Sequence, residues 1–303
     1  MDFCTNKIFM PLCGKSILQH ILDNVHSTGL NDITVVSSQQ NYKKIGTMHY
    51  VKQVCVQKIA NGTGGAVLCT LPSLNLHNKL TLVFNGDGPV LCTEFLHKFL
   101  SNFDADLRIL TNFASVHSTN GRVLRKNGKI VGLREFKDAS ELEKQITECN
   151  AGVYLFDTQK LCKHITKLTQ NNAQHEFYLT DLIEIFNKNN LKIDSVAMDT
   201  KNNYLSVNTM HELSIQNEKM QKEIKQNLIK KGVLFVHPNS AYIDACAIVG
   251  VHSTIYGGVQ ILGNTCVGEE CIVLPNCVII NSQISPKTTV PAGSVIVDNK
   301  HKK

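Results

Sequence analysis

The chain has 303 residues, of which 43% are hydrophobic and 18% charged, and its formal net charge is +6. This composition is typical of a folded globular protein, excludes an intrinsically disordered one, and at this length favours two domains. The sequence has no basic block interleaved with aromatic residues, no apolar run long enough to cross a bilayer and no secretory signal, so we expect a cytoplasmic protein that binds neither nucleic acid nor membrane.

The first two-thirds of the chain alternates helical segments with short apolar runs rich in β-branched residues. The runs predict strands at 33–36, 51–57, 80–84, 107–111 and 151–156, and the segments between them predict helices near 17–26, 66–71, 92–103, 158–168 and 179–187. This alternation is typical of an α/β fold with a doubly wound, mostly parallel sheet. Because ligands of such sheets bind beyond the carboxyl ends of the strands, residues that directly follow a strand are the first candidates for chemistry.

Residues 210–231 predict one basic helix, ended by Gly232, that joins the two domains. After it, an aliphatic residue recurs every six positions, with a single five-residue step between Ile279 and Ile284. A small or slim residue stands two positions before each. This period fits neither a helix nor a flat strand and predicts a triangular β-helix of about three coils. The ten aliphatic positions are Ile243, Val249, Ile255, Ile261, Val267, Val273, Ile279, Ile284, Val290 and Ile296.

Asn85-Gly86-Asp87 follows the strand predicted at 80–84, so we expect Asp87 to project into the crevice. A carboxylate there suits Mg²⁺, which typically takes one or two protein ligands together with substrate phosphates. The alternative, which stays open at this point, is an aspartate that only caps a Gly-Asp-Gly-Pro turn. Residues 57–65 form a second, glycine-rich loop between a strand and a helix, where backbone N–H groups can approach a base or phosphate.

Several other motifs are incomplete. Cys13-Gly14-Lys15-Ser16 matches the end of a phosphate-binding loop, but Phe9 stands where that loop needs a glycine. His175-Glu176 has no second histidine at zinc-protease spacing. The eleven cysteines form neither a C-x-x-C pair nor a zinc cluster, and we expect them to be reduced and mostly buried.

Taken in order, a set of short segments carries a family resemblance. They are Asn6-Lys7 through Lys15, Gln57 with Gly62-Thr63-Gly64, 85–89, Asn120-Gly121-Arg122, 135–139, 148–152, 171–181 and Val207-Asn208. The order and approximate spacing resemble those of the bacterial N-acetylglucosamine-1-phosphate uridyltransferase of the bifunctional uridyltransferase/acetyltransferase type, within the sugar nucleotidyltransferase superfamily. Each segment is weak by itself, whereas the ordered set, from about residue 5 to about residue 297, is specific.

The resemblance implies a nucleotidyltransferase domain over 1–209, a linker helix over 210–232, a left-handed parallel β-helix of hexapeptide repeats over 233–297 and a tail over 298–303. It implies a pyrophosphorylase that makes UDP-N-acetylglucosamine and pyrophosphate from UTP and N-acetylglucosamine 1-phosphate, for cell-wall or envelope precursors. Catalysis of this kind is mainly positioning and neutralisation of phosphate charge.

The resemblance also implies the roles of individual residues. Asp87 and Asn208 would hold Mg²⁺, and Lys7 would contact the phosphates, which makes Lys7 and Asp87 the expected catalytic residues. The remaining expected substrate-binding residues are Gln57, Gly62 and Thr63 for the uracil, Asn85 and Gly86 beside Asp87, Gly121, Glu135 and Asn150 for the amino sugar, and Tyr178 and Thr180 nearby.

Two departures from the family pattern matter. The family places a strand and a Gly-x-Gly-x-Arg loop just before the segment at Asn6-Lys7, where only residues 1–5 precede it here, and Asn6 replaces a proline. Either the true start lies upstream, or the chain is a decayed or repurposed relative. The β-helix is also short, so we expect no acetyltransferase activity, and we expect it to support a homotrimer.

Three alternatives remain for the function. The near one is a nucleotidyltransferase for another sugar 1-phosphate such as glucose 1-phosphate. The second is a sugar-nucleotide-binding or scaffold protein that has lost catalysis. A stand-alone hexapeptide-repeat acyltransferase is disfavoured, because no histidine lies late in the coils and His252 lies in an early one.

Overall fold

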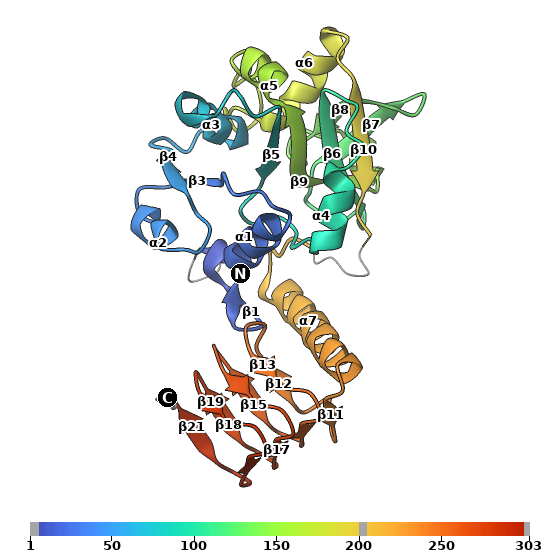
Figure 1. The fold of residues 1–303 in the computed structure, drawn as a ribbon. Helices are drawn as coiled ribbons and strands as arrows, with labels where there is room; N and C mark the ends of the chain where they lie inside the picture. The colour runs from blue at the N-terminus through green and yellow to red at the C-terminus, as the bar shows by residue number, and fades with distance from the viewer. Residues whose placement is uncertain (1–5, 200–204, 300–303) are drawn as a thin grey trace. The chain divides into compact units, whose positions relative to one another are not determined.

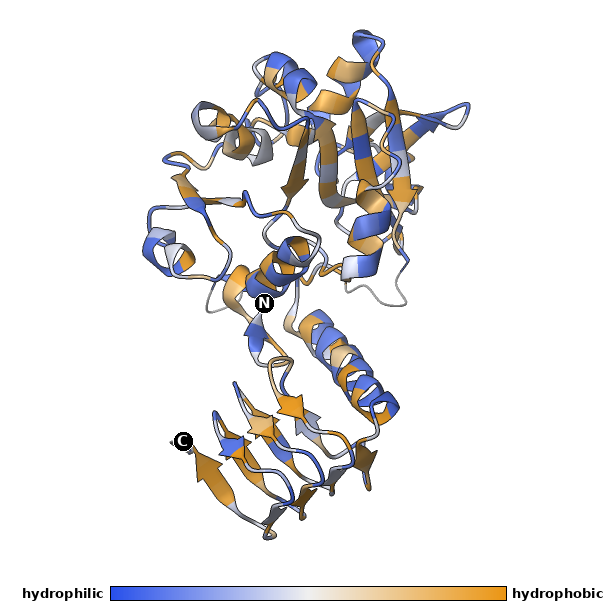
Figure 2. Cartoon of the chain, in the orientation of Figure 1, coloured by the Kyte–Doolittle hydropathy of each residue, from blue (hydrophilic) through white to orange (hydrophobic). Residues whose placement is uncertain are grey.

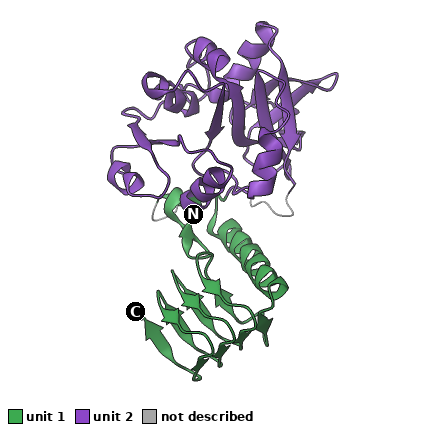
Figure 3. Ribbon diagram, in the orientation of Figure 1, with its two compact units in different colours: residues 1–17, 207–303 green, residues 18–206 purple. Residues whose placement is uncertain are grey.

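The computed structural model describes residues 6–199 and 205–299. The chain forms two compact units, of which one comprises Met1–Ile17 with Val207–Lys303 and the other comprises Leu18–Ser206 (Figure 3). Each unit has its own cluster of buried apolar side chains. The segment boundaries expected at residues 209, 232 and 297 stay a prediction.

The unit Leu18–Ser206 is built on a six-stranded sheet (Figure 1). Neighbouring strands follow the order β10 (Ile193–Ala197), β6 (Leu107–Phe113), β9 (Glu148–Asp157), β7 (Arg122–Lys126) and β8 (Lys129–Arg134), and β5 (Leu80–Phe84) also pairs with β9. β10 pairs with β6 in parallel, and β9 lies antiparallel between β5 and β6. β5, β6 and β10 therefore run in one direction.

Two further pairings complete the strands of this unit. β3 (Thr34–Ser37) and β4 (Gln53–Val56) pair in parallel as a separate two-stranded sheet. β7 and β8 form an antiparallel hairpin, whose turn residues Asn127 and Gly128 have φ of 52° and 77°. Positive φ at both turn positions matches the right-handed twist of the flanking strands. The α/β fold class is confirmed.

The helices of this unit each bury apolar side chains. They are α1 (Ile17–Ser27, whose first residue belongs to the other unit), α2 (Tyr42–Gly46), α3 (Thr63–Leu68), α4 (Thr93–Leu100), α5 (Thr158–Ile165) and α6 (Leu182–Lys188), with 3-10 turns η2 (Leu71–Ser73), η3 (Glu143–Gln145) and η4 (Leu179–Asp181). α5 packs on β9, and α6 packs on β8 and β10. Phe156 on β9 and Phe186 on α6 meet edge to face in the core, where the strands are strongly hydrophobic (Figure 2).

The second unit contains the β-helix, seen at the red end of the chain in Figure 1. Its strands form three parallel sheets, in the orders β11-β14-β17-β20, β12-β15-β18-β21 and β13-β16-β19. Ile243 pairs with Ile261, 18 residues further on, whereas Val267 pairs with Ile284, only 17 residues on. The six-residue period and its one five-residue step are therefore confirmed, and nine of the ten aliphatic positions are buried, with Ile296 partly buried. The strands are β11 (Leu234–Phe235), β12 (Tyr242–Ile243), β13 (Ile248–Val249), β14 (Thr254–Ile255), β15 (Gln260–Leu262), β16 (Cys266–Val267), β17 (Ile272–Val273), β18 (Val278–Ile280), β19 (Gln283–Ile284), β20 (Thr289–Val290) and β21 (Val295–Val297).

Helix α7 (Met210–Lys230) is more than the spacer that its sequence predicts. Ile224 and Leu228 pack against the apolar core of the β-helix, and the amide of Gln221 donates to the carbonyl of Ile243 across 2.6 Å. The helix begins with a capping box, in which Thr209 and Glu212 satisfy each other's backbone N–H groups. α7 is therefore part of the β-helix unit.

The N-terminal segment belongs to the same unit. It forms η1 (Lys7–Phe9) and a hairpin of β1 (Pro11–Leu12) and β2 (Lys15–Ser16). The backbone N–H of Cys13 donates to Asn217 of α7, and the carbonyl of Cys13 accepts from Ala245. Burial raises the pKa of the Cys13 thiol to about 11, so the thiol is neutral and structural.

The state of the cysteines and the hydrophobicity of the helices can be read from the described residues. All ten cysteines in residues 6–199 and 205–299 are free, although only four are fully buried. Within the same residues, no helix is both long and apolar enough to cross a membrane.

Candidate functional site

The loop between β4 and α3 carries the three residues expected at the uracil. The side-chain amide of Gln57 donates to Asn61 Oδ1 across 2.8 Å and to the carbonyl of Gly62 across 3.1 Å, which fixes the orientation of that amide. Thr63 is exposed at the start of α3, and its hydroxyl oxygen accepts from the backbone N–H of Leu179 across 3.1 Å. The structure thus brings Gln57, Gly62 and Thr63 into one loop.

Gly62 is required by the geometry of this loop. Its φ of 97° lies in the region that favours glycine, and a Cβ there would stand 2.6 Å from the carbonyl oxygen of Phe177. Phe177 also accepts from the N–H of Gly64 across 2.7 Å and donates to the carbonyl of Asn61 across 2.8 Å. These backbone contacts bind the loop directly to the segment 171–181, the most specific motif of the sequence.

The turn after β5 carries Asn85, Gly86 and Asp87. Asn85 donates its backbone N–H to the carbonyl of Gly152 on β9 across 2.9 Å, and its own carbonyl closes the turn by accepting from Gly88. Gly152 has a φ of 75°, and a Cβ there would lie 2.6 Å from the Asn85 amide nitrogen. Gly86 is exposed and Asp87 is half-buried, and both follow the carboxyl end of β5; that the Asp87 carboxylate projects into the crevice stays a prediction.

The residues expected at the amino sugar also meet. The backbone N–H of Asn150, on β9, donates to the carbonyl of Gly121 across 2.8 Å. A Cβ on Gly121 would lie 3.3 Å from a carboxylate oxygen of Glu135. The hydroxyl of the buried Thr180 donates to Glu135 across 3.1 Å. Four of the predicted residues, from four segments of the chain, are therefore neighbours, and Tyr178 accepts from Gln174 beside them through its hydroxyl.

Burial raises the pKa of the Glu135 carboxyl, and the nearby Asp181 and Asp138 add to that effect, while the hydrogen bond from Thr180 opposes it. Burial also raises the pKa of Asp181 to about 6, together with the like charge of Glu184. Perturbed carboxyls in a cluster are a recognised mark of functional sites. This cluster is acidic and polar, and it suits a neutral ligand group that donates hydrogen bonds.

Lys7 and Asn208 lie together in the β-helix unit. The ammonium group of Lys7 donates to Asn208 Oδ1 across 2.8 Å, and Asn208 directly precedes the N-cap of α7. A carboxylate such as that of Asp87 is a hard oxygen donor of the kind that Mg²⁺ prefers, whereas Asn208 Oδ1 already accepts from the Lys7 ammonium. Asp87 therefore has the donor chemistry that the ion needs. No cluster of three or more His, Cys, Asp or Glu side chains suited to a metal occurs in the part of the chain that the structure describes.

Two residues beside the site were missed as functional candidates by sequence reasoning. Tyr154 is fully buried on β9, and its hydroxyl accepts from the Asn150 amide across 2.6 Å. Arg122 is also fully buried, next to Gly121. Tyr154 carries no local signal, because it reads as an apolar strand residue. Arg122 carries a weak one, since it directly follows Gly121 in one of the motifs of the family resemblance.

Comparisons with known proteins identify the family of the chain. Residues 1–176 match the family described as "MobA-like NTP transferase domain". The chain is 32% identical over 301 residues to the "Bifunctional protein GlmU" of Exiguobacterium sibiricum, with 97% of this chain and 66% of that protein covered. The proteins of the same name in Halalkalibacterium halodurans and Enterococcus faecalis are 31% and 32% identical over 288 residues, with 94% of this chain and 63% of each relative covered.

The chain thus spans less than two thirds of the length of these relatives. The family match covers more than half of the chain and includes the loop at Gln57, the turn at Asp87 and the Glu135 and Asn150 segments. The resemblance inferred from the ordered motifs is confirmed. The chain belongs to the MobA-like NTP transferase family, as a relative of the bacterial bifunctional protein GlmU.

Proposed function

We propose that this protein is a uridylyltransferase that converts UTP and N-acetylglucosamine 1-phosphate into UDP-N-acetylglucosamine and pyrophosphate. A phosphate oxygen of the sugar phosphate forms a bond to the α-phosphorus of UTP, and the bond to the β-phosphate breaks as pyrophosphate leaves. The observation that carries the proposal is the convergence of Gly121, Glu135, Asn150 and Thr180 in a chain of the NTP transferase family.

The amino sugar is favoured by the chemistry of Glu135. A carboxylate held by Thr180 and half-buried beside Gly121 is an acceptor for a donor group of the ligand. The acetamido N–H of N-acetylglucosamine is such a donor. Glucose carries a hydroxyl at the same position, which can also donate a hydrogen bond, so we expect the preference for the N-acetylated sugar to rest on how the N–H and the acetyl group fit beside Glu135.

The nucleotide is expected at the loop that follows β4. Hydrogen bonds to Asn61 and Gly62 hold the side-chain amide of Gln57 in place. An amide oriented in this way can pair with the donor and acceptor edge of uracil. The φ of Gly62 and its close approach to Phe177 hold the backbone of this loop in one conformation against the segment 171–181.

The phosphates would be bound by Lys7 and by Mg²⁺ with Asp87 as its ligand, and the resemblance assigns Asn208 to the same ion. The ion, when bound, would neutralise negative charge on the triphosphate. Lys7 would add a compact positive charge, and the backbone bond from Asn85 to Gly152 holds the turn that carries Asp87 before the substrate arrives.

The direct test is a substrate panel with the full chain. Pyrophosphate release is measured with UTP and Mg²⁺ in the presence of N-acetylglucosamine 1-phosphate, glucose 1-phosphate or no sugar phosphate. We expect turnover with the N-acetylated sugar and at least tenfold lower efficiency with glucose 1-phosphate. Turnover with glucose 1-phosphate alone would refute the amino-sugar assignment, and sugar-nucleotide binding without any turnover would favour a binding protein.

Three further expectations belong to the same proposal. The product would serve cell-wall or envelope precursors, and the β-helix would support a homotrimer. We expect no acetyl transfer, because the two histidines of the described coils, His237 and His252, both lie early in the β-helix. Release of free CoA from acetyl-CoA and glucosamine 1-phosphate at an enzymatic rate would contradict that expectation.

A further inference from the structure

Arg122, at the start of β7, is the largest fully buried side chain of the described residues. A guanidinium group has five N–H donors, and each of them has an acceptor here. Nη2 donates to the carbonyls of Val116 and Ser118, Nη1 donates to the carbonyl of Asn120 and to Cys149 Sγ, and Nε donates to the carbonyl of Lys144, over 2.6 to 3.3 Å. None of the ion pairs recorded for residues 6–199 and 205–299 includes Arg122.

A buried cation without a carboxylate partner is costly unless polar groups replace its hydration. Here four carbonyl oxygens and a sulfur do so. The guanidinium carbon also lies 5.3 Å from the centre of the Phe136 ring, and the Lys144 ammonium lies 5.4 Å from the same ring. Arg122 therefore connects the loop 114–121, the segment around Phe136 and the strand β9 through a single side chain.

The residues that contact Arg122 are sequence neighbours of the expected amino-sugar ligands. Gly121 directly precedes Arg122, Glu135 directly precedes Phe136, and Asn150 directly follows Cys149. We propose that Arg122 is a positioning residue that holds these three segments in register, so that it sets the affinity for the sugar phosphate without touching it. This inference rests on the proposed function, because it assigns the segments to the sugar.

Lysine cannot replace Arg122 in this role. It keeps the positive charge but offers only three donors from one nitrogen, and it has no plane to lie against Phe136. Arg122→Lys therefore removes at least two of the five hydrogen bonds, and we expect the loop 114–121 to move relative to Glu135. Small displacements of positioning groups can lower rates by about a hundredfold.

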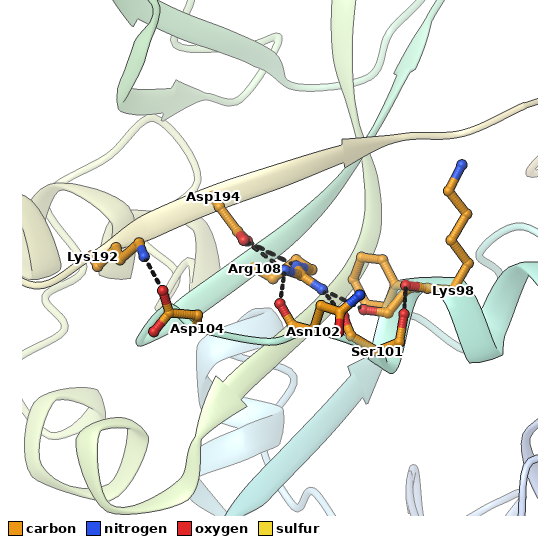
Figure 4. Close-up of polar contacts among 8 residues, drawn as sticks. Lys98, Ser101, Asn102, Asp104, Arg108, Lys192 and Asp194 are labelled. Carbon is orange, nitrogen blue, oxygen red and sulfur yellow. Dashed lines mark hydrogen bonds and ion pairs between the residues drawn. The ribbon is translucent and has the colours of Figure 1, made fainter.

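The chain offers a matched control in Arg108 on β6 (Figure 4). Arg108 is also buried, at 7% exposure, and it donates to the carbonyls of Phe99, Ser101 and Asn102. Its remaining bonds go to the Asp194 carboxylate, a partner of a kind that Arg122 lacks, and its guanidinium carbon lies 5.4 Å from the centre of the Phe103 ring, as that of Arg122 lies near Phe136. None of its partners adjoins an expected ligand of the sugar. Arg108→Lys thus reports the cost of loosening a buried arginine in the same unit.

The experiment compares the full-length wild type, Arg122→Lys and Arg108→Lys by steady-state kinetics. We expect Arg122→Lys to raise KM for N-acetylglucosamine 1-phosphate about tenfold or more and KM for UTP less than twofold, and we expect Arg108→Lys to change neither KM. An unchanged KM for the sugar phosphate in Arg122→Lys overturns the inference. Equal changes in both variants, or equal effects on the two substrates, overturn it as well.

Two further measurements keep the test decisive. If Arg122→Lys does not fold, Phe136→Leu removes the ring while keeping an apolar side chain, and we expect a smaller change in KM for the sugar phosphate in the same direction. Amide hydrogen exchange needs no activity: Arg122→Lys should increase exchange in 114–121 and 148–151, and Arg108→Lys should increase it in 99–102. Unchanged exchange in 114–121 overturns the inference even if wild type turns over no sugar phosphate, an outcome that by itself refutes only the proposed function.

Discussion

Thr180 donates its hydroxyl hydrogen to a carboxylate oxygen of Glu135 across 3.1 Å, although 45 residues separate the two in the chain. The bond brings the segment 135–139 to the segment 171–181, which in turn contacts the loop at Gly62 through Phe177. The expected sugar-binding and base-binding segments are therefore parts of one hydrogen-bonded network within the unit Leu18–Ser206.

Glu135→Gln tests the sugar-binding role of this carboxylate. Glutamine keeps the shape and the acceptor for Thr180 but removes the charge, and a hydrogen bond to a charged group contributes about 1.5–3 kcal/mol. We expect KM for N-acetylglucosamine 1-phosphate to rise about tenfold to a hundredfold, with KM for UTP unchanged. Glu141→Gln, an exposed glutamate nearby, is the control. Equal kinetics for Glu135→Gln and wild type would contradict the assignment.

Gly62→Ala tests the base-binding loop. Gly62 combines a φ of 97° with a backbone oxygen 2.6 Å from the added Cβ, whereas Gly29 has a φ of 89° with open space around it. Gly29→Ala therefore isolates the cost of the backbone conformation, which is about 1 kcal/mol or more. We expect Gly62→Ala to lose more stability in thermal unfolding and to raise KM for UTP selectively. If both alanine variants behave alike, the loop does not require the close approach to Phe177.

The titration of Asp181 predicts a pH dependence of stability. Burial raises its pKa to about 6, above the usual value of 3.8, so the native state holds the proton more tightly than the unfolded chain. The stabilising contribution of Asp181 is complete below pH 4 and is lost as pH rises through 6. We expect Asp181→Asn to raise the unfolding temperature at pH 7.5, by the equivalent of about 1 kcal/mol after allowance for solvent, and to have little effect near pH 4. A difference independent of pH would contradict the prediction.

The β-helix core can be tested at Ile261, which is fully buried and pairs with Ile243 and Ile279 in neighbouring coils. We expect Ile261→Ala to lower the free energy of unfolding by about 2–5 kcal/mol, because the coil cannot collapse around the cavity. Ile248→Ala, at a position that is 62% exposed on the same β-helix, should change it by about 0.5 kcal/mol or less. Chemical denaturation measures both, and similar losses in the two variants would contradict the assigned faces.

The elements with a strong local signal could be predicted from the sequence. The strand at 80–84 is found at those residues, and the β-helix follows both its six-residue period and its one short step. The hairpin β7–β8 was missed, although Asn127-Gly128 is a turn signal, because charged residues stand at both ends of each strand and leave only short apolar runs between them. β10 was missed because its short run of Ile193–Ala197 includes Asp194, whose charge is matched by Arg108 only in the folded sheet.

The candidate site could be predicted as a set of ordered motifs but not as a set of contacts. Resemblance pointed to Gly121, Glu135 and Asn150, and their proximity depends on strand pairing between β7 and β9 that no local pattern reveals. The contacts of Arg122 with Lys144 and Cys149 span 22 and 27 residues, so its role emerges only from the folded chain.

The central claim is that Asp87 supports nucleotidyl transfer at the end of β5. The most direct measurement is pyrophosphate release by the full-length Asp87→Ala variant, with UTP, N-acetylglucosamine 1-phosphate and Mg²⁺, beside wild type and the control Asp32→Ala, an exposed aspartate paired with Lys52. We expect Asp87→Ala to lose activity by about a hundredfold or more while remaining folded, and Asp32→Ala to match wild type. An active wild type whose pyrophosphate release is unchanged by Asp87→Ala would contradict the claim.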